Sequence, residues 1–257
     1  MKEHIILGKW SQDKLDSILH ESAKIKDAGA RINFLSGFFL DVNYKKSTLI
    51  GDINTPEIFV INLQPVDCFT FIDYIEAMRR AGSFSEFKGN LKKVRYRNGK
   101  VTFENRNHFF TDWQKFNSEF IDDLTLQIGG KKTKTVAKIL NKKEDGTYFL
   151  NGILPQQREI QYIPSDAIDG SLMDKIKTGD YAGIYSETQG LDVSHVGIII
   201  KNKDSTYPVR KNISNGVNLR HASSRYKKVI DQDFRNYISN KPGLIVLRPK
   251  KKLKIKN

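Results

Sequence analysis

The sequence predicts an α+β fold, with helices in the first half of the chain and antiparallel strands dominating the second half. Apolar residues recur at helical spacing through much of the first half, whereas short apolar runs between turn signals follow after residue 133. The chain contains no internal repeat and no long linker. We therefore expect one domain over residues 1–257, with a helical lead-in at 1–36 and a basic tail at 248–257.

In the first half, Ser11 is placed to cap a helix over 11–27, whose apolar face includes Leu15 and Leu19. The apolar run 57–63 indicates a strand that Pro65 ends, and the polar stretch before it indicates a loop. The turn Asn98-Gly99 predicts a hairpin over 94–103. Helical spacing predicts four further helices, over 29–37, 68–82, 83–91 and 112–124.

In the second half, the turn Glu144-Asp145-Gly146 separates two predicted strands, and Asn215-Gly216 is a strong hairpin signal. Pro164-Ser165-Asp166 opens a short helix that we expect to end near Ile176. The predicted strands cover 133–140, 159–163, 181–186, 193–200, 217–223 and 244–247, and a helix covers 232–239.

The chain is strongly basic, with a net charge of +14 and a pI near 9.6. A basic protein is attracted to polyanions such as nucleic acid, anionic lipid or the acidic polymers of a cell wall. No RNA-recognition motif, helix-turn-helix pattern or zinc finger is present, so we expect no nucleic-acid partner. The tail at 248–257 is expected to be a solvated, solubilising end.

Cys68 is the single cysteine of the 257 residues, which excludes an internal disulfide, and no Cys/His spacing suggests a zinc site. We expect no metal and no organic cofactor. No run approaches the roughly 20 apolar residues of a membrane span. Residues 1–10 do not form a signal peptide, so the protein is either cytosolic or begins after a removed leader.

The stretch around Cys68 indicates a nucleophile. Asp67 can cap the helix that begins there, which places the thiol in the first helical turn. Aligned amides and the helix dipole favour an anion at that position, so we expect the pKa of the thiol to fall. A lone cysteine among Phe and Ile side chains is more often a small buried hydrophobe, and the stretch alone does not exclude this.

Two histidines supply partners for such a thiol. His195 and His221 lie on predicted neighbouring strands, and alternation allows both to occupy one face of the sheet. We expect the helix that carries Cys68 to pack on that same face, with Gly197 allowing the helix end to approach closely. A thiolate, an imidazole that exchanges protons with it and a polar group that orients the imidazole are what nucleophilic acyl transfer requires.

Four stretches of the chain occur in a characteristic order: Asp67-Cys68-Phe69-Thr70-Phe71, residues 105–113, residues 190–198 and residues 219–224. Together they resemble the N-acetylmuramoyl-L-alanine amidase-like family, and the resemblance covers about Leu35 to Leu247. That family is similar to the NlpC-type cell-wall cysteine peptidases, whose core is papain-like. The resemblance implies a papain-like core, a triad of Cys68, His195 and His221, and hydrolysis of an amide bond in peptidoglycan stem peptides.

The resemblance also implies substrate contacts and a compartment. Asp67 occupies the position whose acid helps to hold the amino end of the substrate in NlpC-type enzymes. Asp112, Trp113 and Ser194 fall in family motifs and are expected to line the cleft. The family's Gly-Thr-Pro-Tyr-like stretch corresponds here to 36–39, which lacks Pro and Tyr, so part of the pocket is expected to differ. Family members are usually exported, which implies the cell envelope or periplasm.

The sequence therefore predicts a monomeric cysteine amidase or endopeptidase that acts on peptidoglycan or muropeptides. It leaves open whether the bond between muramic acid and L-alanine or the one between D-glutamate and the diamino acid is cut. The alternative is a non-catalytic basic protein that binds cell-wall polymer or nucleic acid through its lysines.

Overall fold

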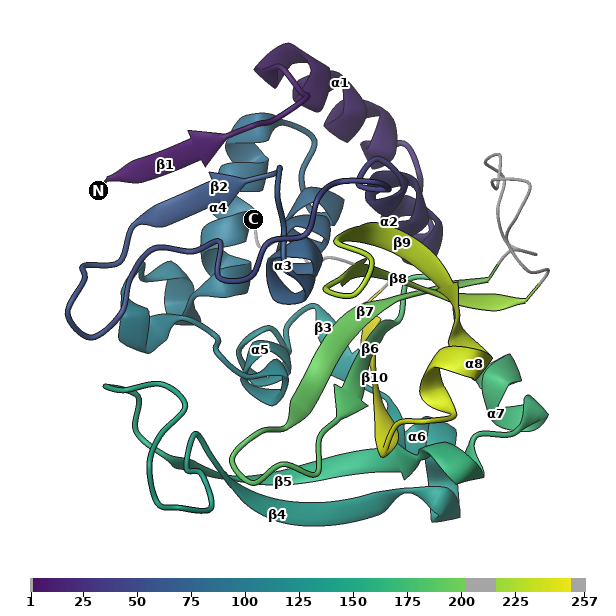
Figure 1. Ribbon diagram of the computed structural model, residues 1–257. Coiled ribbons are helices and arrows are strands. Elements are labelled where there is room, and N and C mark those ends of the chain that lie inside the picture. The colour runs from purple at the N-terminus through teal and green to yellow at the C-terminus, as the bar shows by residue number, and fades with distance from the viewer. Residues whose placement is uncertain (1, 202–215, 251–257) are drawn as a thin grey trace.

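The computed structural model describes residues 2–201 and 216–250 and has mixed α+β architecture (Figure 1). Helices predominate in the first half of the chain, and two short strands pair there in parallel. These elements are β1 (Glu3–Ile6), α1 (Gln12–Ala23), α2 (Ala28–Gly37), β2 (Phe59–Asn62), α3 (Cys68–Arg79), α4 (Phe84–Arg95) and α5 (Phe110–Phe116). The predicted lead-in is therefore not wholly helical, because β1 pairs with β2.

The rest of the described chain is organised around an eight-stranded sheet in the order β4-β5-β10-β6-β7-β8-β9, with β3 also paired to β10. Every neighbouring pair in this sheet is antiparallel. The strands are β3 (Ile121–Asp123), β4 (Lys134–Leu140), β5 (Gln156–Pro164), β6 (Tyr181–Tyr185), β7 (Val193–Lys201), β8 (Val217–Ser223), β9 (Lys228–Asp233) and β10 (Gly243–Pro249). Three short helices accompany them: α6 (Thr125–Gly129), α7 (Gly170–Lys175) and α8 (Phe234–Ile238).

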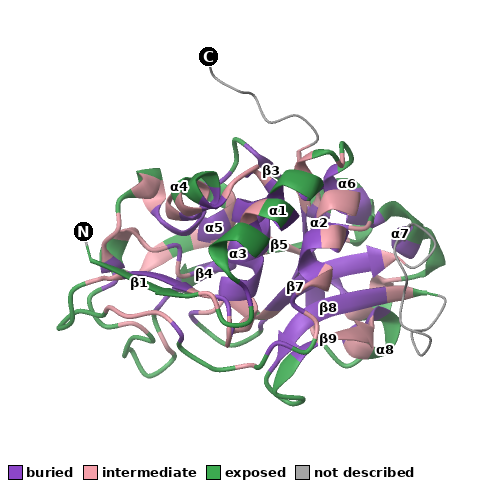
Figure 2. Ribbon diagram, turned by 90° about the horizontal axis from the view of Figure 1, so that it is seen from above, coloured by how far each residue is buried: buried purple, intermediate pink, exposed green. Residues whose placement is uncertain are grey.

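The sheet has a hydrophobic cluster on each face. Val196, Ile198 and Ile200 of β7 belong to the larger cluster, which also contains the apolar faces of α1 to α5. Ile199 belongs to the smaller cluster, under α6, α7 and α8. Both faces of the central strands are therefore buried, as the coloured ribbon shows (Figure 2). Alternation along β7 decides which layer each of its side chains enters.

Several predicted elements are wrong. Residues 94–103 do not form a hairpin: Val94 is fully buried in the last turn of α4, and Asn98-Gly99 makes a local turn of positive φ. The helix predicted over 112–124 ends at Phe116, and β3 follows. Strand β9 was not predicted at all. The signal at Asn215 and the tail beyond residue 250 lie outside the described residues.

Within the described ranges, no helix combines the length and the apolar character needed to cross a bilayer.

Candidate active site

Cys68 occupies the first position of α3, and Asp67 caps that helix as the sequence predicts. Asp67 Oδ1 accepts hydrogen bonds from the backbone N–H groups of Phe69 and Thr70, at 3.1 and 2.8 Å. The Thr70 hydroxyl also donates to Oδ1, at 2.9 Å, and the Asp67 N–H donates to that hydroxyl, at 3.0 Å. This capping box uses one carboxylate oxygen, and Asp67 Oδ2 makes no hydrogen bond within the described residues.

His195 and His221 form a hydrogen-bonded pair, as alternation on neighbouring strands predicts. His195 Nε2 lies 2.7 Å from His221 Nδ1, and the ring centroids are 4.8 Å apart with nearly perpendicular planes. His221 Nε2 lies 3.3 Å from Gln232 Oε1 on β9. A Cβ added at Gly197 would lie 2.7 Å from Leu219 Cδ1 and 3.0 Å from His221 Cβ. Gly197 therefore lets β8 and its side chains approach closely, whereas the sequence suggested that it makes room for the helix end.

The helix of Cys68 packs on the opposite face of the sheet from the one predicted. His195 pairs with Ile184 of the smaller core cluster, whereas α3 contributes Phe71 and Ile72 to the larger one. The pairing of β7 with β8 ends at Ile198 opposite Arg220, short of His195. The backbone N–H of Val196 hydrogen-bonds the Cys68 sulfur, so the thiol meets β7 directly beside His195. The start of α3 thus reaches β7 where its pairing with β8 has stopped.

The thiol and the two imidazoles of the site are neutral at rest. Burial, and secondarily the Asp67 carboxylate, raises the pKa of Cys68 to about 12, although the backbone N–H groups of Val196, Cys68 and Phe69 oppose the shift. The expectation that the thiol pKa falls is therefore wrong, because these effects outweigh the helix N-terminus. Burial lowers the pKa of His195 to about 3 and that of His221 to about 4. A neutral thiol and neutral imidazoles are the expected resting state.

Two tyrosines beside Cys68 were missed by the sequence analysis. The Tyr237 ring of α8 lies 5.3 Å from His221 and 6.3 Å from His195, and burial and the Cys68 charge raise the pKa of Tyr237 to about 12. Burial, then the charges of Cys68 and Asp67, also raises the pKa of Tyr44. The stretch 36–39 lacks the tyrosine of the family's Gly-Thr-Pro-Tyr-like motif, but Tyr44 and Tyr237 both lie near the thiol. Tyr44 lies in a predicted loop, which gave no signal of this proximity.

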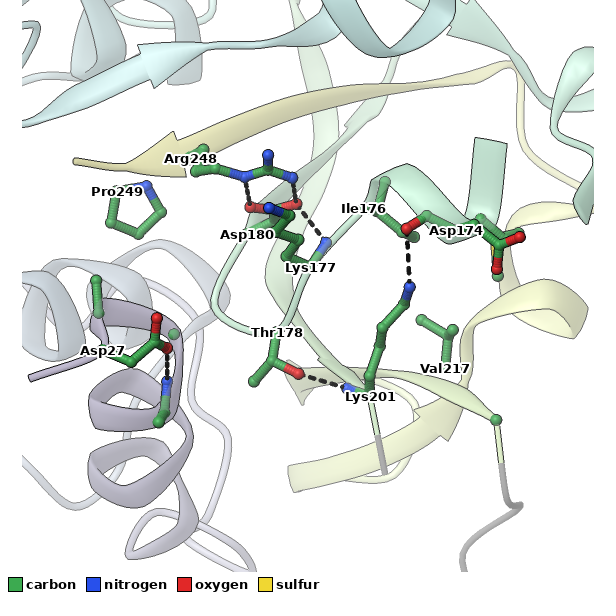
Figure 3. Close-up of a pocket in the computed structure, with 15 residues that line it drawn as sticks. Asp27, Asp174, Ile176, Lys177, Thr178, Asp180, Lys201, Val217, Arg248 and Pro249 are labelled. Carbon is green, nitrogen blue, oxygen red and sulfur yellow. Dashed lines mark hydrogen bonds and ion pairs between the residues drawn. The ribbon is translucent and has the colours of Figure 1, made fainter. Parts of the chain in front are cut away.

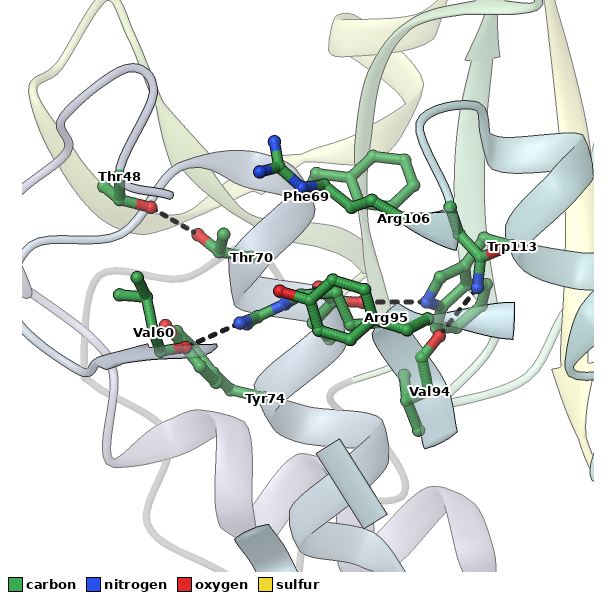
Figure 4. Close-up of polar contacts among 12 residues, drawn as sticks. Thr48, Val60, Phe69, Thr70, Tyr74, Val94, Arg95, Arg106 and Trp113 are labelled. Atoms are coloured by element: carbon green, nitrogen blue, oxygen red, sulfur yellow. Dashed lines mark hydrogen bonds and ion pairs between the residues drawn. The ribbon is translucent and has the colours of Figure 1, made fainter. Parts of the chain in front are cut away.

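Asp112 and Trp113 are placed in the interior. Asp112 is ion-paired with Arg158, and Arg97 lies 3.5 Å from its second oxygen. The Trp113 side chain is 0% exposed, and its indole N–H donates to Asp73 at 2.9 Å (Figure 4). These contacts give both residues a structural role, and their contact with substrate stays a prediction.

Ser194 differs, because it is exposed and adjoins His195 on β7. Its hydroxyl lies 3.4 Å from the Ile184 carbonyl. Ser194 is therefore placed where a substrate could reach it.

A cavity of about 730 Å³ lies away from these residues, between the start of α2 and the turn that joins α7 to β6 (Figure 3). Two of its basic side chains already have partners. Arg248 binds both oxygens of Asp180 at 2.7 Å, and Lys201 Nζ donates to the Asp174 carbonyl at 3.3 Å. In residues 2–201 and 216–250, no group of three or more His, Cys, Asp or Glu side chains is arranged to hold a metal ion.

Comparison of the sequence with models of known protein families identifies the family of this chain. The sequence model described as AmiA-like, N-acetylmuramoyl-L-alanine amidase-like, matches residues 34–244 and so spans most of the chain. The chain belongs to this amidase-like family. The matched range of this chain includes Cys68, His195, His221 and Gln232. A search of curated proteins found no match.

Solved structures share the architecture of this amidase-like protein. A Legionella pneumophila protein of family DUF1460 superposes with a TM-score of 0.75 at 22% identity, over 93% of this chain and 94% of that one. An N-acetylmuramoyl-L-alanine amidase from Bacteroides uniformis superposes with a TM-score of 0.66 at 26% identity, over 92% and 99% of the two chains. The first likeness concerns the fold alone, whereas the second is to a protein named as an amidase.

Proposed function

We propose that this protein is a cysteine-dependent hydrolase that cuts an amide bond in peptidoglycan stem peptides. One observation carries the proposal: the thiol at the capped start of α3 meets β7 beside His195, whose ring is hydrogen-bonded to His221. Family membership supports the amide substrate, and the name of the Bacteroides uniformis amidase supports the bond between muramic acid and L-alanine. Cleavage between D-glutamate and the diamino acid is the competing outcome.

In the proposed first step, the Cys68 sulfur attacks the carbonyl carbon while its proton passes to His195. The Nε2 atom of His195 is engaged with His221, so Nδ1 is the ring atom left to accept that proton. Since both groups are neutral at rest, transfer accompanies attack and does not precede it. His221 holds the ring orientation and stabilises the imidazolium that forms.

The developing oxyanion needs hydrogen-bond donors. The first-turn N–H groups of Phe69 and Thr70 are occupied by Asp67, but the N–H of Cys68 has no acceptor other than the sulfur within the described residues. We assign it to the oxyanion, a role that is worth roughly 10²–10³ in rate for one donor. The His195 imidazolium then protonates the leaving amine, and a thioester to Cys68 remains.

Water then completes the proposed cycle. His195 accepts a proton from the water as it attacks the thioester carbonyl, and the thiol recovers that proton when the carboxylic acid leaves. Asp67 Oδ2 is available for an N–H or amino group of the substrate, because the cap occupies only Oδ1. One carboxylate can therefore serve both roles predicted for it.

The wider assignments follow from family membership and charge. We propose that the helix and sheet around Cys68 form a papain-like core related to the NlpC-type peptidases. The net charge of +14 favours contact with the anionic wall polymers, and we propose that the protein acts in the cell envelope as a monomer. Cell fractionation with antibody detection of the protein tests the location, and light scattering of the purified protein tests the monomeric state.

The test is digestion of purified peptidoglycan and muropeptides by the wild type and by Cys68→Ala, with products identified by mass spectrometry. We expect release of intact stem peptides with a free L-alanine amino group by the wild type, and none by the variant. A thermal unfolding curve that matches the wild type is the control that Cys68→Ala remains folded. Equal activity of the two proteins would reject the thiol mechanism.

A non-catalytic basic binder predicts a different outcome. It would bind peptidoglycan with a steep dependence on salt and release no product. Slow alkylation of the thiol at neutral pH does not separate the two hypotheses, because the thiol pKa is raised. Trapping of a Cys68 thioester by rapid acid quench, followed by mass spectrometry, supports the hydrolase directly.

A further inference from the structure

Gln232 on β9 continues the chain of hydrogen bonds that starts at His195. His221 lies opposite Ile230 in the register of β8 and β9, so Gln232, two residues further on, shares its face. Its Oε1 atom lies 3.3 Å from His221 Nε2. The three side chains come from three consecutive strands at one end of the sheet, β7, β8 and β9.

The chemistry of the amide sets the proton positions along this chain. An amide oxygen only accepts hydrogen bonds, so the His221 Nε2 atom facing it must carry a proton. A neutral imidazole has one N–H, and His221 Nδ1 is then an acceptor. His195 Nε2 must in turn donate to it across 2.7 Å. His195 Nδ1 is thereby left with a lone pair and no proton.

A general base needs an unprotonated nitrogen, so His195 can act as one only with this arrangement of protons on the two rings. If the amide nitrogen of Gln232 faced His221 instead, every hydrogen bond in the chain would reverse, and His195 Nδ1 would carry a proton. A protonated Nδ1 cannot accept the proton of a neutral thiol. The orientation of one amide group therefore decides whether His195 can act.

We propose that Gln232 is a positioning residue that selects the Nε2–H tautomer of both histidines and so leaves His195 Nδ1 able to accept the thiol proton. The inference rests on the proposed hydrolase function and adds to it a fourth residue. Gln232 touches neither substrate nor thiol and acts through His221. No proton leaves the chain through Gln232: the thiol proton moves only to His195 Nδ1 and later to the leaving amine.

Charged and titratable groups surround the pair on several elements. Burial is the main cause of the lowered pKa of both rings. Asp231, which is ion-paired with Arg220 on the other face of β9, partly opposes the shift of the His221 pKa, whereas His221 and then Lys241 add to the lowering of the His195 pKa. The Tyr237 ring packs on both imidazoles from α8, and Cys68 approaches with α3. A carboxylate at position 232 would add a negative charge within hydrogen-bond reach of His221, and would stabilise the protonated pair.

The decisive measurement is the ring-nitrogen NMR spectrum of the two histidines in ¹⁵N-labelled protein, with assignment by His195→Gln and His221→Gln. We expect both rings of the wild type in the Nε2–H form near neutral pH. In Gln232→Leu, which cannot accept the hydrogen bond, we expect His221 to show a mixture of tautomers. Wild-type rings in the Nδ1–H form, or unchanged rings in Gln232→Leu, would overturn the proposal.

Turnover of muropeptide substrate adds a second readout. Gln232→Leu should lose about tenfold or more in kcat, equal to about 1.4 kcal/mol, the order of one hydrogen bond. Gln232→Glu should keep the tautomer and move the acid limb of kcat/KM upward by about one pH unit or more. Gln157 is exposed on the distant strand β5, so Gln157→Leu and Gln157→Glu are matched controls that should change neither readout.

These measurements can reject the role of Gln232 and the proposed hydrolase function separately. Because the NMR spectrum needs no turnover, an inactive wild type with the expected tautomers would reject the hydrolase and leave the role of Gln232 in place. An active wild type whose tautomers and pH profile ignore position 232 would reject Gln232 alone. Thermal unfolding of each variant identifies any loss that is due to misfolding.

Discussion

Asp67 and Thr70 hold each other through reciprocal hydrogen bonds at the start of α3. The carboxylate accepts from the Thr70 N–H and hydroxyl, and the hydroxyl accepts from the Asp67 N–H. Cys68 lies between the two residues that form this box. The stability of the helix end and the reactivity of the thiol are therefore coupled through Asp67.

Substitution of Asp67 separates these two effects. Asp67→Ala removes the cap and should cost about 1 kcal/mol in the free energy of unfolding, measured with urea. Asp67→Asn keeps an acceptor and should cost less, but it removes a charge that raises the pKa of Cys68. Iodoacetamide should therefore modify Cys68 faster in Asp67→Asn at pH 8. Thr70→Val is the control that weakens the box without a change in charge, and an equal acceleration there would contradict the electrostatic explanation.

Stability should fall in mild acid because His108 is neutral in the folded protein. Burial, opposed by a hydrogen bond to the Phe103 carbonyl, lowers the pKa of His108 to about 4, against about 6.5 in the unfolded chain. Between these values the unfolded chain binds a proton that the folded chain does not. This contribution to stability is complete above pH 6.5 and is lost as the pH falls toward 4.

The difference between the wild type and His108→Gln isolates that contribution. The slope of unfolding free energy against pH should be lower in the variant, by up to about 1.4 kcal/mol per pH unit near pH 5. Urea titrations at half-unit steps from pH 4 to 7.5 measure it. Parallel curves for the two proteins over this range would show that His108 takes up a proton as readily in the folded protein as in the unfolded chain.

Arg95 should be among the most costly residues to replace. It is buried between α3 and β2, where Nε donates to Asp73 at 2.8 Å and Nη1 donates to the Val60 carbonyl at 2.6 Å (Figure 4). Arg95→Met leaves the buried Asp73 without its counter-charge, at an expected cost of about 3–5 kcal/mol in unfolding free energy.

A double variant tests the reason for this cost. Asp73→Asn keeps the acceptor for the Trp113 indole and removes the charge, so Arg95→Met with Asp73→Asn should be more stable than Arg95→Met alone. Urea unfolding of the four proteins gives the coupling free energy. Additive losses would mean that packing, not the buried charge, sets the cost.

Local signals predicted much of the fold. The cap at Asp67, the start of α3 and the pairing of β7 with β8 follow from short-range patterns, and the structure confirms each. The prediction of a hairpin over 94–103 was wrong because Val94 is buried in the last turn of α4. Tertiary packing of this residue outweighs the local preference of the turn dipeptide Asn98-Gly99. Strand β9 was missed because apolar and polar residues alternate only weakly over 228–233. Within this strand Val229 is the one buried side chain.

The sequence predicted that the strands of His195 and His221 are neighbours, but not how the helix of Cys68 packs against them. Alternation placed His195 and His221 together, but a period of two does not specify which layer of the fold each face meets. The helix of Cys68 was therefore assigned to the wrong face. Gln232 and Tyr237 were missed because they depend on β9 and on the turn into α8, and contacts across such distances leave no local pattern.

The irregular segment 41–45 ties the two sides of the site together. On one side it bonds β9, through Asp41 N–H to the Val229 carbonyl at 3.0 Å and Val229 N–H to the Val42 carbonyl at 2.8 Å. On the other it bonds Val66, through the Asn43 carbonyl and the Lys45 N–H, both at 3.0 Å. A stretch with no regular structure of its own thus behaves as an interior strand. Its amide hydrogens should exchange with solvent as slowly as those of β8, and any insertion there should part the thiol from the histidines.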